Sequence, residues 1–230
     1  MTSETVDSLK GIALFDLDHT LIPLDSDFAW GEFTTAMGWT DPTDFKRQNE
    51  AFYEQYKDGT LDVHAYARFA TAAICRKGVA ESLAAHAKFM RDVIQKAVHP
   101  QAMELVRTHR EAGETIVIVT ATNEFVTRPI ARVFGADELI AVELETDPST
   151  GWYTGEIKGI PSFREGKVAR VEAWLNSNGL SWDTVRTTFY SDSINDVPLM
   201  EKATVAVATN PDERLRAHAL QRGWRILQLF

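Results

Sequence analysis

Short apolar runs and amphipathic segments alternate along much of this chain. Uncharged stretches rich in β-branched residues are typical of buried strands, whereas longer segments with apolar residues at every third or fourth position are typical of packed helices. The pattern predicts strands at 11–15, 115–120, 187–191, 203–208 and 225–229, and helices at 101–112, 124–134 and 167–176. Two more short strands, 139–145 and 152–157, flank a turn at 147–151. This alternation predicts an α/β fold with a Rossmann-like parallel sheet.

The segment after the first predicted strand has a different pattern of residues. Between residues 24 and 96, aromatic residues recur at spacings of three and four with charged residues between them, which predicts about four helices. Turn or cap signals at 41–44, 57–60 and Gly78 separate these helices. We therefore expect a core domain of residues 1–22 and 97–230, and an inserted helical domain of residues 23–96 with most of its aromatic residues in its interior.

Two carboxylates close the first strand. Asp16 and Asp18 follow the apolar run at the end of the strand where open parallel sheets bind ligands. Carboxylates so close together repel each other unless a proton or a cation relieves them, and Mg²⁺ prefers such oxygen ligands. The alternative is a strand-end turn, in which either carboxylate accepts from free backbone N–H groups.

Two further positions offer groups that bind anions. Thr120-Ala121-Thr122 ends the second strand, and its hydroxyl and N–H groups can bind phosphate oxygens, or one threonine can simply be the N-cap of the next helix. Lys167 begins a helix, where its charge opposes the helix dipole, so optimisation of that dipole does not explain it. Arg164 is a weaker candidate for the same cationic role.

Another acidic stretch, 191–196, follows the strand at 187–191. Asp192 would complete the metal site, and Asn195 could donate to a phosphate oxygen. Asp196 would brace Lys167 or a water on the metal, or would act as N-cap of the helix that follows.

These motifs, in this order, resemble those of the haloacid dehalogenase-like (HAD) phosphatases, subfamily IB, in the phosphoserine-phosphatase-like branch. The residues that carry this resemblance are Asp16-Leu17-Asp18-His19-Thr20, Thr120, Lys167 and Ser191-Asp192-Ser193-Ile194-Asn195-Asp196. The resemblance implies that Asp16 is a nucleophile that becomes an aspartyl-phosphate, and that Asp18 is the general acid and then the base. It implies that Thr120 binds phosphate and that Lys167 offsets its charge, with Mg²⁺ held by Asp16, the Asp18 carbonyl and Asp192. The inserted helices then resemble a C1 cap.

Composition limits the partners. The net charge of −9 leaves no basic surplus for nucleic acid. The single cysteine, Cys75, excludes an internal disulfide and fits a reducing, cytoplasmic compartment. The polar segment 1–7 lacks the features of a signal peptide, and no apolar run approaches the length of a membrane span. The sequence does not indicate an oligomeric state.

The expected substrate is a small-molecule phosphate monoester. Asp18 and Asp192 argue against a dehalogenase, whereas a phosphotransferase and a non-catalytic binding module of the same fold stay open. Phosphoserine phosphatases of this branch use a Glu and an Arg of the cap, for which Glu32 and, more weakly, Arg47 or Arg68 are candidates. Related bacterial proteins are often histidinol-phosphate phosphatases, so both substrates stay open.

Overall fold

Six strands form one parallel sheet in the computed structural model, which describes residues 9–230. Their order is β3-β2-β1-β6-β7-β8, and every neighbouring pair is parallel. The strands are β1 (Lys10–Phe15), β2 (Thr115–Asn123), β3 (Glu138–Val142), β6 (Val185–Ser191), β7 (Val205–Thr209) and β8 (Arg225–Leu227). The predicted parallel α/β fold is confirmed. The segment considered for a signal peptide, 1–7, lies outside the described residues.

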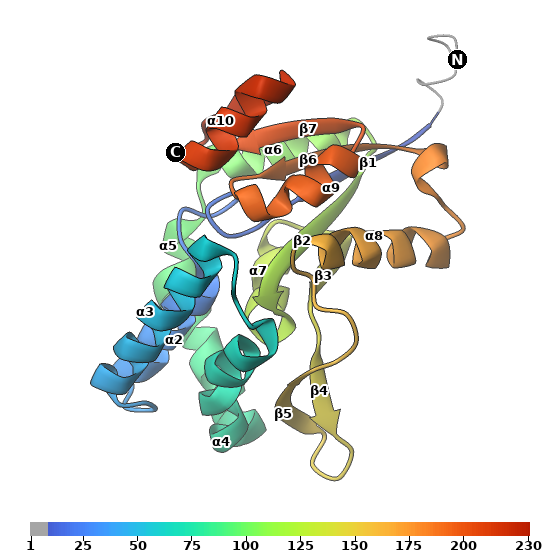
Figure 1. Ribbon diagram of the computed structural model, residues 1–230. Helices are drawn as coiled ribbons and strands as arrows, with labels where there is room; N and C mark the ends of the chain where they lie inside the picture. The colour runs from blue at the N-terminus through green and yellow to red at the C-terminus, as the bar shows by residue number, and fades with distance from the viewer. Residues whose placement is uncertain (1–8) are drawn as a thin grey trace.

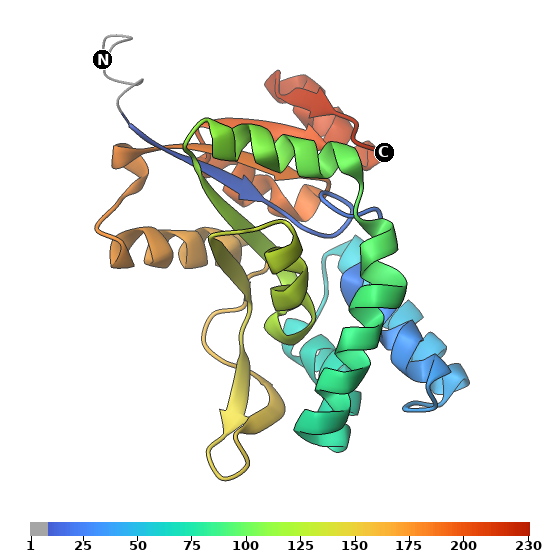
Figure 2. The ribbon, with the colours of Figure 1, turned by 180° about the vertical axis from the view of Figure 1, so that it is seen from behind.

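Helices cover both faces of this sheet. Alternate residues of β1 point to opposite faces, so Ala13 and Phe15 pack on one side and Ile12 and Leu14 on the other. The first side is covered by α6 (Pro100–Glu111) and α7 (Glu124–Val133), which lie in front of the sheet in Figure 2. The second side is covered by α8 (Glu165–Ser177), α9 (Val197–Lys202) and α10 (Glu213–Arg222), in front in Figure 1. Short 3₁₀ turns, η2 (Trp182–Thr184) and η3 (Ile194–Asp196), flank β6.

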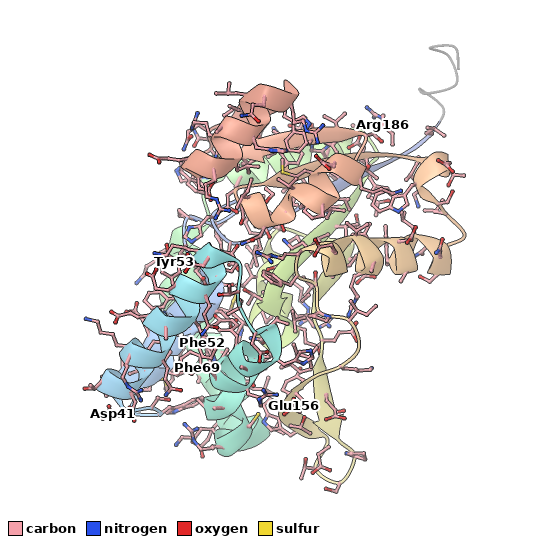
Figure 3. All side chains as sticks on the ribbon, viewed as in Figure 1. Asp41, Phe52, Tyr53, Phe69, Glu156 and Arg186 are labelled. Atoms are coloured by element: carbon pink, nitrogen blue, oxygen red, sulfur yellow. The ribbon has the colours of Figure 1, made fainter. Side chains whose placement is uncertain are left out.

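The helices between β1 and α6 form a separate group, and we call it the helical insertion. It comprises α2 (Ser26–Ala36), α3 (Pro42–Asp58), α4 (Val63–Phe89), a π-helical turn η1 (Met90–Ile94) and α5 (Gln95–Ala97). These helices stand beside one end of the sheet (Figure 1). The rings of Phe52 in α3 and Phe69 in α4 pack with centroids 5.2 Å apart, as Figure 3 labels them. No helix of the described residues is both long and apolar enough to cross a bilayer.

The break predicted at Gly78 is a kink within one helix. Gly78 has φ 72° and ψ −177°, while α4 continues on both sides of it. The carbonyl of Ile74, one turn earlier, accepts hydrogen bonds from the Trp152 indole N–H at 2.8 Å and from the Ser82 hydroxyl at 3.3 Å. The kink therefore lies where α4 is joined to the strand that carries Trp152.

The strand predicted at 139–145 is two strands. The main-sheet strand β3 ends at Val142, and β4 (Leu144–Asp147) pairs antiparallel with β5 (Trp152–Ile157) in a separate hairpin. The polar residue between them, Glu143, forms an ion pair with Arg170 of α8, so the chain leaves the sheet there. The hairpin also meets the helical insertion, because Glu156 of β5 pairs with Arg68 of α4 at 3.0 Å (Figure 3).

Candidate active site

The main residues predicted for the site line one cavity, whereas the weaker candidates Arg47, Arg68 and Arg164 do not. Its volume is about 1550 Å³, and it lies at the carboxyl ends of β1, β2 and β6, against α2 and α3 of the helical insertion. The predicted residues in its wall are Asp16, Asp18, Glu32, Thr120, Ala121, Lys167, Asp192, Asn195 and Asp196. Parallel strands present their carboxyl ends at one edge of a sheet, which is why residues so distant in sequence meet here.

A buried ammonium group joins two of the acidic residues. The Lys167 Nζ donates to Asp16 Oδ1 at 2.8 Å and to Asp196 Oδ2 at 2.7 Å, and Lys167 is 2 % exposed. Burial by itself lowers the pKa of Lys167, but the two carboxylates outweigh it and raise that pKa above its ordinary value. The ammonium therefore stays charged at neutral pH.

A glycine brings Lys167 to this position. Lys167 is the third residue of α8, and a Cβ at Gly166 would lie 2.0 Å from the carbonyl oxygen of Pro161. Only glycine allows the first turn of α8 to pack so closely on the preceding loop.

Asp196 stands at the N-cap position of α9, as predicted, but the expectation that its side chain caps the helix is wrong. Its side chain makes no capping bond to α9 and instead accepts from Lys167 and, at 2.7 Å, from the Ser191 hydroxyl. The N-cap interpretation of the threonines is also wrong, because Asn123 is the N-cap of α7, where its side chain accepts from the Val126 N–H at 3.2 Å. β2 runs on to Asn123, so Ala121 belongs to the strand.

Asp18 is held by neutral donors. Its carboxylate accepts from the Ser26 N–H at 2.9 Å and from the Thr122 hydroxyl at 2.7 Å. Burial, followed by the nearby charge of Asp25, raises the pKa of Asp18 to about 6. A carboxyl with that pKa can both give and take a proton near neutral pH. The sequence prediction did not include Thr122 in this role or Asp25, although Asp25 stands at the N-cap of the first inserted helix.

Thr20 links the other two carboxylates of the site. Its hydroxyl lies 3.1 Å from Asp16 Oδ2 and 3.3 Å from Asp192 Oδ1, and it also accepts from the Asp192 N–H at 3.1 Å. One hydroxyl has one hydrogen, so it can donate to only one of the two carboxylates at a time. Thr20 belongs to the first motif, and its side chain was not assigned a role from the sequence.

The donor set fits a hard divalent cation. Burial, together with Asp16 and Asp196, raises the pKa of Asp192 well above its ordinary value, so the site disfavours this concentration of negative charge without a cation. Carboxylate and carbonyl oxygens are the ligands that Mg²⁺ prefers. Among the described residues no three His, Cys, Asp or Glu side chains converge as a closed metal cage. Backbone carbonyl, water or substrate oxygens would therefore have to complete the coordination.

Arg164 does not share the role of Lys167. Its guanidinium donates to Asn195 Oδ1 and to the Gly59 carbonyl oxygen, and not to Asp16. The weaker assignment of Arg164 as a second cation for the nucleophile is therefore wrong. Arg47 and Arg68 also lie elsewhere, paired with Asp44 and Glu156 and outside the cavity wall.

The helical insertion contributes an aromatic and acidic wall. More aromatic residues face the cavity than the sequence indicated: Phe28, Phe45, Tyr53, Tyr56 and Tyr66. The same wall contains the carboxylates Asp25, Glu32 and Glu50 and the ammonium groups of Lys46 and Lys57. This part of the cavity suits a partly aromatic group that carries positive charge.

The family model of the haloacid dehalogenase-like hydrolases matches residues 13–201. The chain belongs to this family. The match begins within β1 and ends within α9, and it includes Asp16, Asp18, Thr120, Lys167 and Asp192. This HAD hydrolase is therefore an enzyme by family as well as by the chemistry of its cavity.

Similar proteins agree with this assignment. The HAD hydrolase is 39% identical to a histidinol-phosphatase of Neisseria meningitidis, over 95% of this chain and 99% of the relative. A crystal structure of a protein of unknown function from Bordetella pertussis superposes with a TM-score of 0.91 at 47% identity, covering 97% and 100% of the two chains. A phosphoserine phosphatase with a phospho-aspartyl intermediate analogue superposes with a TM-score of 0.66 at 16% identity, covering 97% and 95%, and so shares the fold.

Proposed function

We propose that this HAD hydrolase is a Mg²⁺-dependent phosphatase that hydrolyses a small-molecule phosphate monoester through an aspartyl-phosphate on Asp16. The observation that carries this proposal is the buried contact of Lys167 with Asp16, beside an Asp18 whose pKa is raised to about 6. The ammonium offsets the repulsion between a carboxylate nucleophile and a phosphate dianion.

The two aspartates divide the reaction between them. A carboxylate oxygen of Asp16 attacks phosphorus, and the bond from phosphorus to the ester oxygen breaks. Asp18 gives its proton to that leaving oxygen, and an alcohol departs. Asp18 then takes a proton from a water, whose oxygen attacks phosphorus and releases inorganic phosphate and the Asp16 carboxylate.

Mg²⁺ would be held by Asp16, Asp192 and the backbone carbonyl of Asp18, and it would neutralise charge on the phosphate. The protein's own anion donors are the Thr120 hydroxyl, the N–H groups near Ala121, the Asn195 amide and the Lys167 ammonium. Thr120 is 1 % exposed, and its hydroxyl oxygen accepts from the Thr122 N–H at 3.1 Å, so its hydrogen is available to a phosphate oxygen.

The helical insertion acts as a cap that recognises the leaving group. Histidinol phosphate is the first substrate to test, because the aromatic and acidic wall suits a cationic imidazole and amine, and because a relative is a histidinol-phosphatase. Glu32 is one candidate contact for that positive charge. Phosphoserine is the second substrate to test, although neither Arg47 nor Arg68 lines the wall to bind its carboxylate.

The test is phosphate release from a panel of phosphorylated metabolites, with Mg²⁺ and with Asp16→Asn as the inactive control. We expect histidinol phosphate to show the highest kcat/KM. Transfer of phosphate to an added alcohol in preference to water would indicate a phosphotransferase. Binding of phosphate esters without turnover of any of them, including p-nitrophenyl phosphate, would indicate a binding module and overturn the proposal.

A further inference from the structure

Arg164 lies at a strained backbone position at the edge of the site. It has φ 51° and ψ −122°, immediately before α8 and three residues before Lys167. A residue with a Cβ is destabilised in this conformation, and such positions persist where surrounding contacts hold them. The side chain of Arg164 supplies those contacts.

One guanidinium joins two parts of the molecule that are distant in sequence. Its Nε and Nη2 donate to Asn195 Oδ1 at 3.2 and 3.0 Å, and its Nη1 donates to the Gly59 carbonyl oxygen at 3.0 Å. Asn195 belongs to the turn η3 at the catalytic edge, whereas Gly59 ends α3 of the helical insertion. Arg164 therefore contacts the site and the insertion through the same planar group.

This contact determines which end of the Asn195 amide faces the cavity. A guanidinium only donates hydrogen bonds, so the Asn195 atom that it contacts must be the oxygen. The NH₂ group is then directed away from Arg164. Asn195 lines the cavity and Arg164 does not, so the guanidinium holds the amide from outside. One of its N–H groups contacts the Tyr56 hydroxyl of α3, and the other is left for an anion.

Two more contacts hold the end of α3 against the core. Arg214 of α10 donates to the Lys57 carbonyl oxygen at 2.8 Å, and the Tyr56 hydroxyl lies 2.9 Å from the Ser193 hydroxyl. The last carbonyls of a helix lack partners within the helix, so they are free to accept from the core. Ser193 and Asn195 are near neighbours, and both contact groups at the end of α3.

We propose that Arg164 is a positioning residue that makes phosphate binding by Asn195 depend on the seating of α3 against the core. When the Gly59 carbonyl is in place, Arg164 has acceptors on both sides and holds the Asn195 amide in one orientation. When α3 moves away, the guanidinium loses one of these acceptors and the amide is released to rotate. The proposal rests on the proposed function, in which Asn195 donates to the phosphate.

Gly59 provides a test that leaves every charged residue in place. A Cβ at Gly59 would come within 2.4 Å of Arg164 Nη2, whereas a Cβ at Gly38 would meet nothing within 4 Å. Both glycines have a left-handed backbone, with φ 75° and 79°, so alanine strains both backbones alike. Gly38→Ala is therefore the matched control. We expect Gly59→Ala to weaken inhibition by inorganic phosphate about tenfold relative to Gly38→Ala.

A double-mutant cycle then tests whether Arg164 acts through Asn195. The variants are Arg164→Ala, Asn195→Ala and both together, with the Kd for inorganic phosphate measured by calorimetry and folding checked by circular dichroism. We expect each single variant to raise the Kd about tenfold, and the double variant to be no weaker than Asn195→Ala alone. A purely structural role for Arg164 would not reproduce this non-additivity.

The outcomes separate the two proposals. Losses that multiply in the double variant, or an Arg164→Ala variant with wild-type affinity, would overturn the positioning role and leave the proposed function standing. A wild-type protein that neither binds phosphate nor releases it from any ester would overturn both. Equal phosphate inhibition of Gly59→Ala and Gly38→Ala would overturn the dependence on α3.

Discussion

Asp16 and Asp18 are two residues apart in sequence and have different neighbours. Asp16 accepts from the Lys167 ammonium at 2.8 Å and from the Thr20 hydroxyl at 3.1 Å. Asp18 accepts from a neutral N–H and a neutral hydroxyl, and burial together with Asp25 raises its pKa to about 6. Different partners thus suit one carboxyl to attack and the other to transfer protons.

The first prediction at this scale concerns Asp16. Asp16→Asn should lower kcat about a thousandfold or more, because an amide is a poor nucleophile, while the fold is kept. The measurement is phosphate release by the purified variant, with circular dichroism as the folding check. The exposed Asp183 provides the control, since Asp183→Asn should retain wild-type activity. A near wild-type rate for Asp16→Asn would show that the nucleophile is another group.

The second prediction concerns Asp18. Asp18→Asn should slow phosphorylation of the enzyme by an alkyl phosphate about 10²–10⁴-fold, because the alkoxide must leave without a proton. p-Nitrophenolate is a good leaving group that needs less protonation. The rate of this step should therefore fall far less with p-nitrophenyl phosphate. Single-turnover kinetics with both esters measure the difference. If both are slowed equally, Asp18 is not the acid.

At the scale of elements, α4 and the β4–β5 hairpin are joined at the Gly78 kink. The Trp152 indole N–H donates to the Ile74 carbonyl, and Arg68 pairs with Glu156 across the same contact. The ion pair is half exposed on both sides and so contributes little. The indole bond is partly buried and should contribute more.

Replacing Trp152 tests this contact. Trp152→Phe should lower the free energy of unfolding by about 1–2 kcal/mol more than Trp182→Phe does. Both side chains are partly exposed, but the Trp182 indole N–H is buried without a hydrogen-bond partner, so phenylalanine removes no bond there. Urea unfolding measures both. Equal losses would mean that the bond to Ile74 contributes nothing to stability.

At the scale of the whole molecule, the strand order places β1 between β2 and β6, and so brings Asp16, Thr120 and Asp192 to one edge. Helix α8 contributes Lys167. Helix α9 packs on the same face of the sheet and follows the turn η3. The helical insertion closes the other side of the cavity with its aromatic wall. In the proposed reaction, phosphate chemistry and leaving-group recognition therefore come from different parts of the chain.

The proposed metal ligands Asp16 and Asp192 follow two different strands, β1 and β6, so the metal site depends on the arrangement of the whole sheet. Excess EDTA should abolish activity and Mg²⁺ should restore it, while Ca²⁺, which accepts more ligands at longer distances, should compete and inhibit. Asp192→Ala should weaken the activation by Mg²⁺ more than Asp196→Ala, since Asp196 contacts Lys167 and Ser191. Titrations of activity against Mg²⁺ measure both. Full activity in EDTA, or a larger effect at Asp196, would contradict this metal site.

The amino-acid sequence alone was enough to predict the parallel α/β core, the helices after the first strand and the main acidic, threonine and lysine residues of the cavity. Buried strands and amphipathic helices leave periods of two and of three to four in the chain, and these depend only on neighbouring residues. Asp16 and Asp192 directly follow such strands and Thr120 lies near the end of another, and parallel strands bring those ends to one edge. For these residues, the position in the local sequence pattern therefore also predicts the position in the fold.

The partners of each of these residues could be seen only in the folded chain. The contacts of Thr20 with Asp192, of Thr122 with Asp18 and of Arg164 with Gly59 join positions about a hundred or more residues apart. They depend on strand register and on how the insertion sits against the core, which no local pattern encodes. The split of β3 from β4 has the same origin, because the ion pair of Glu143 with Arg170 on α8 forms only in the folded chain.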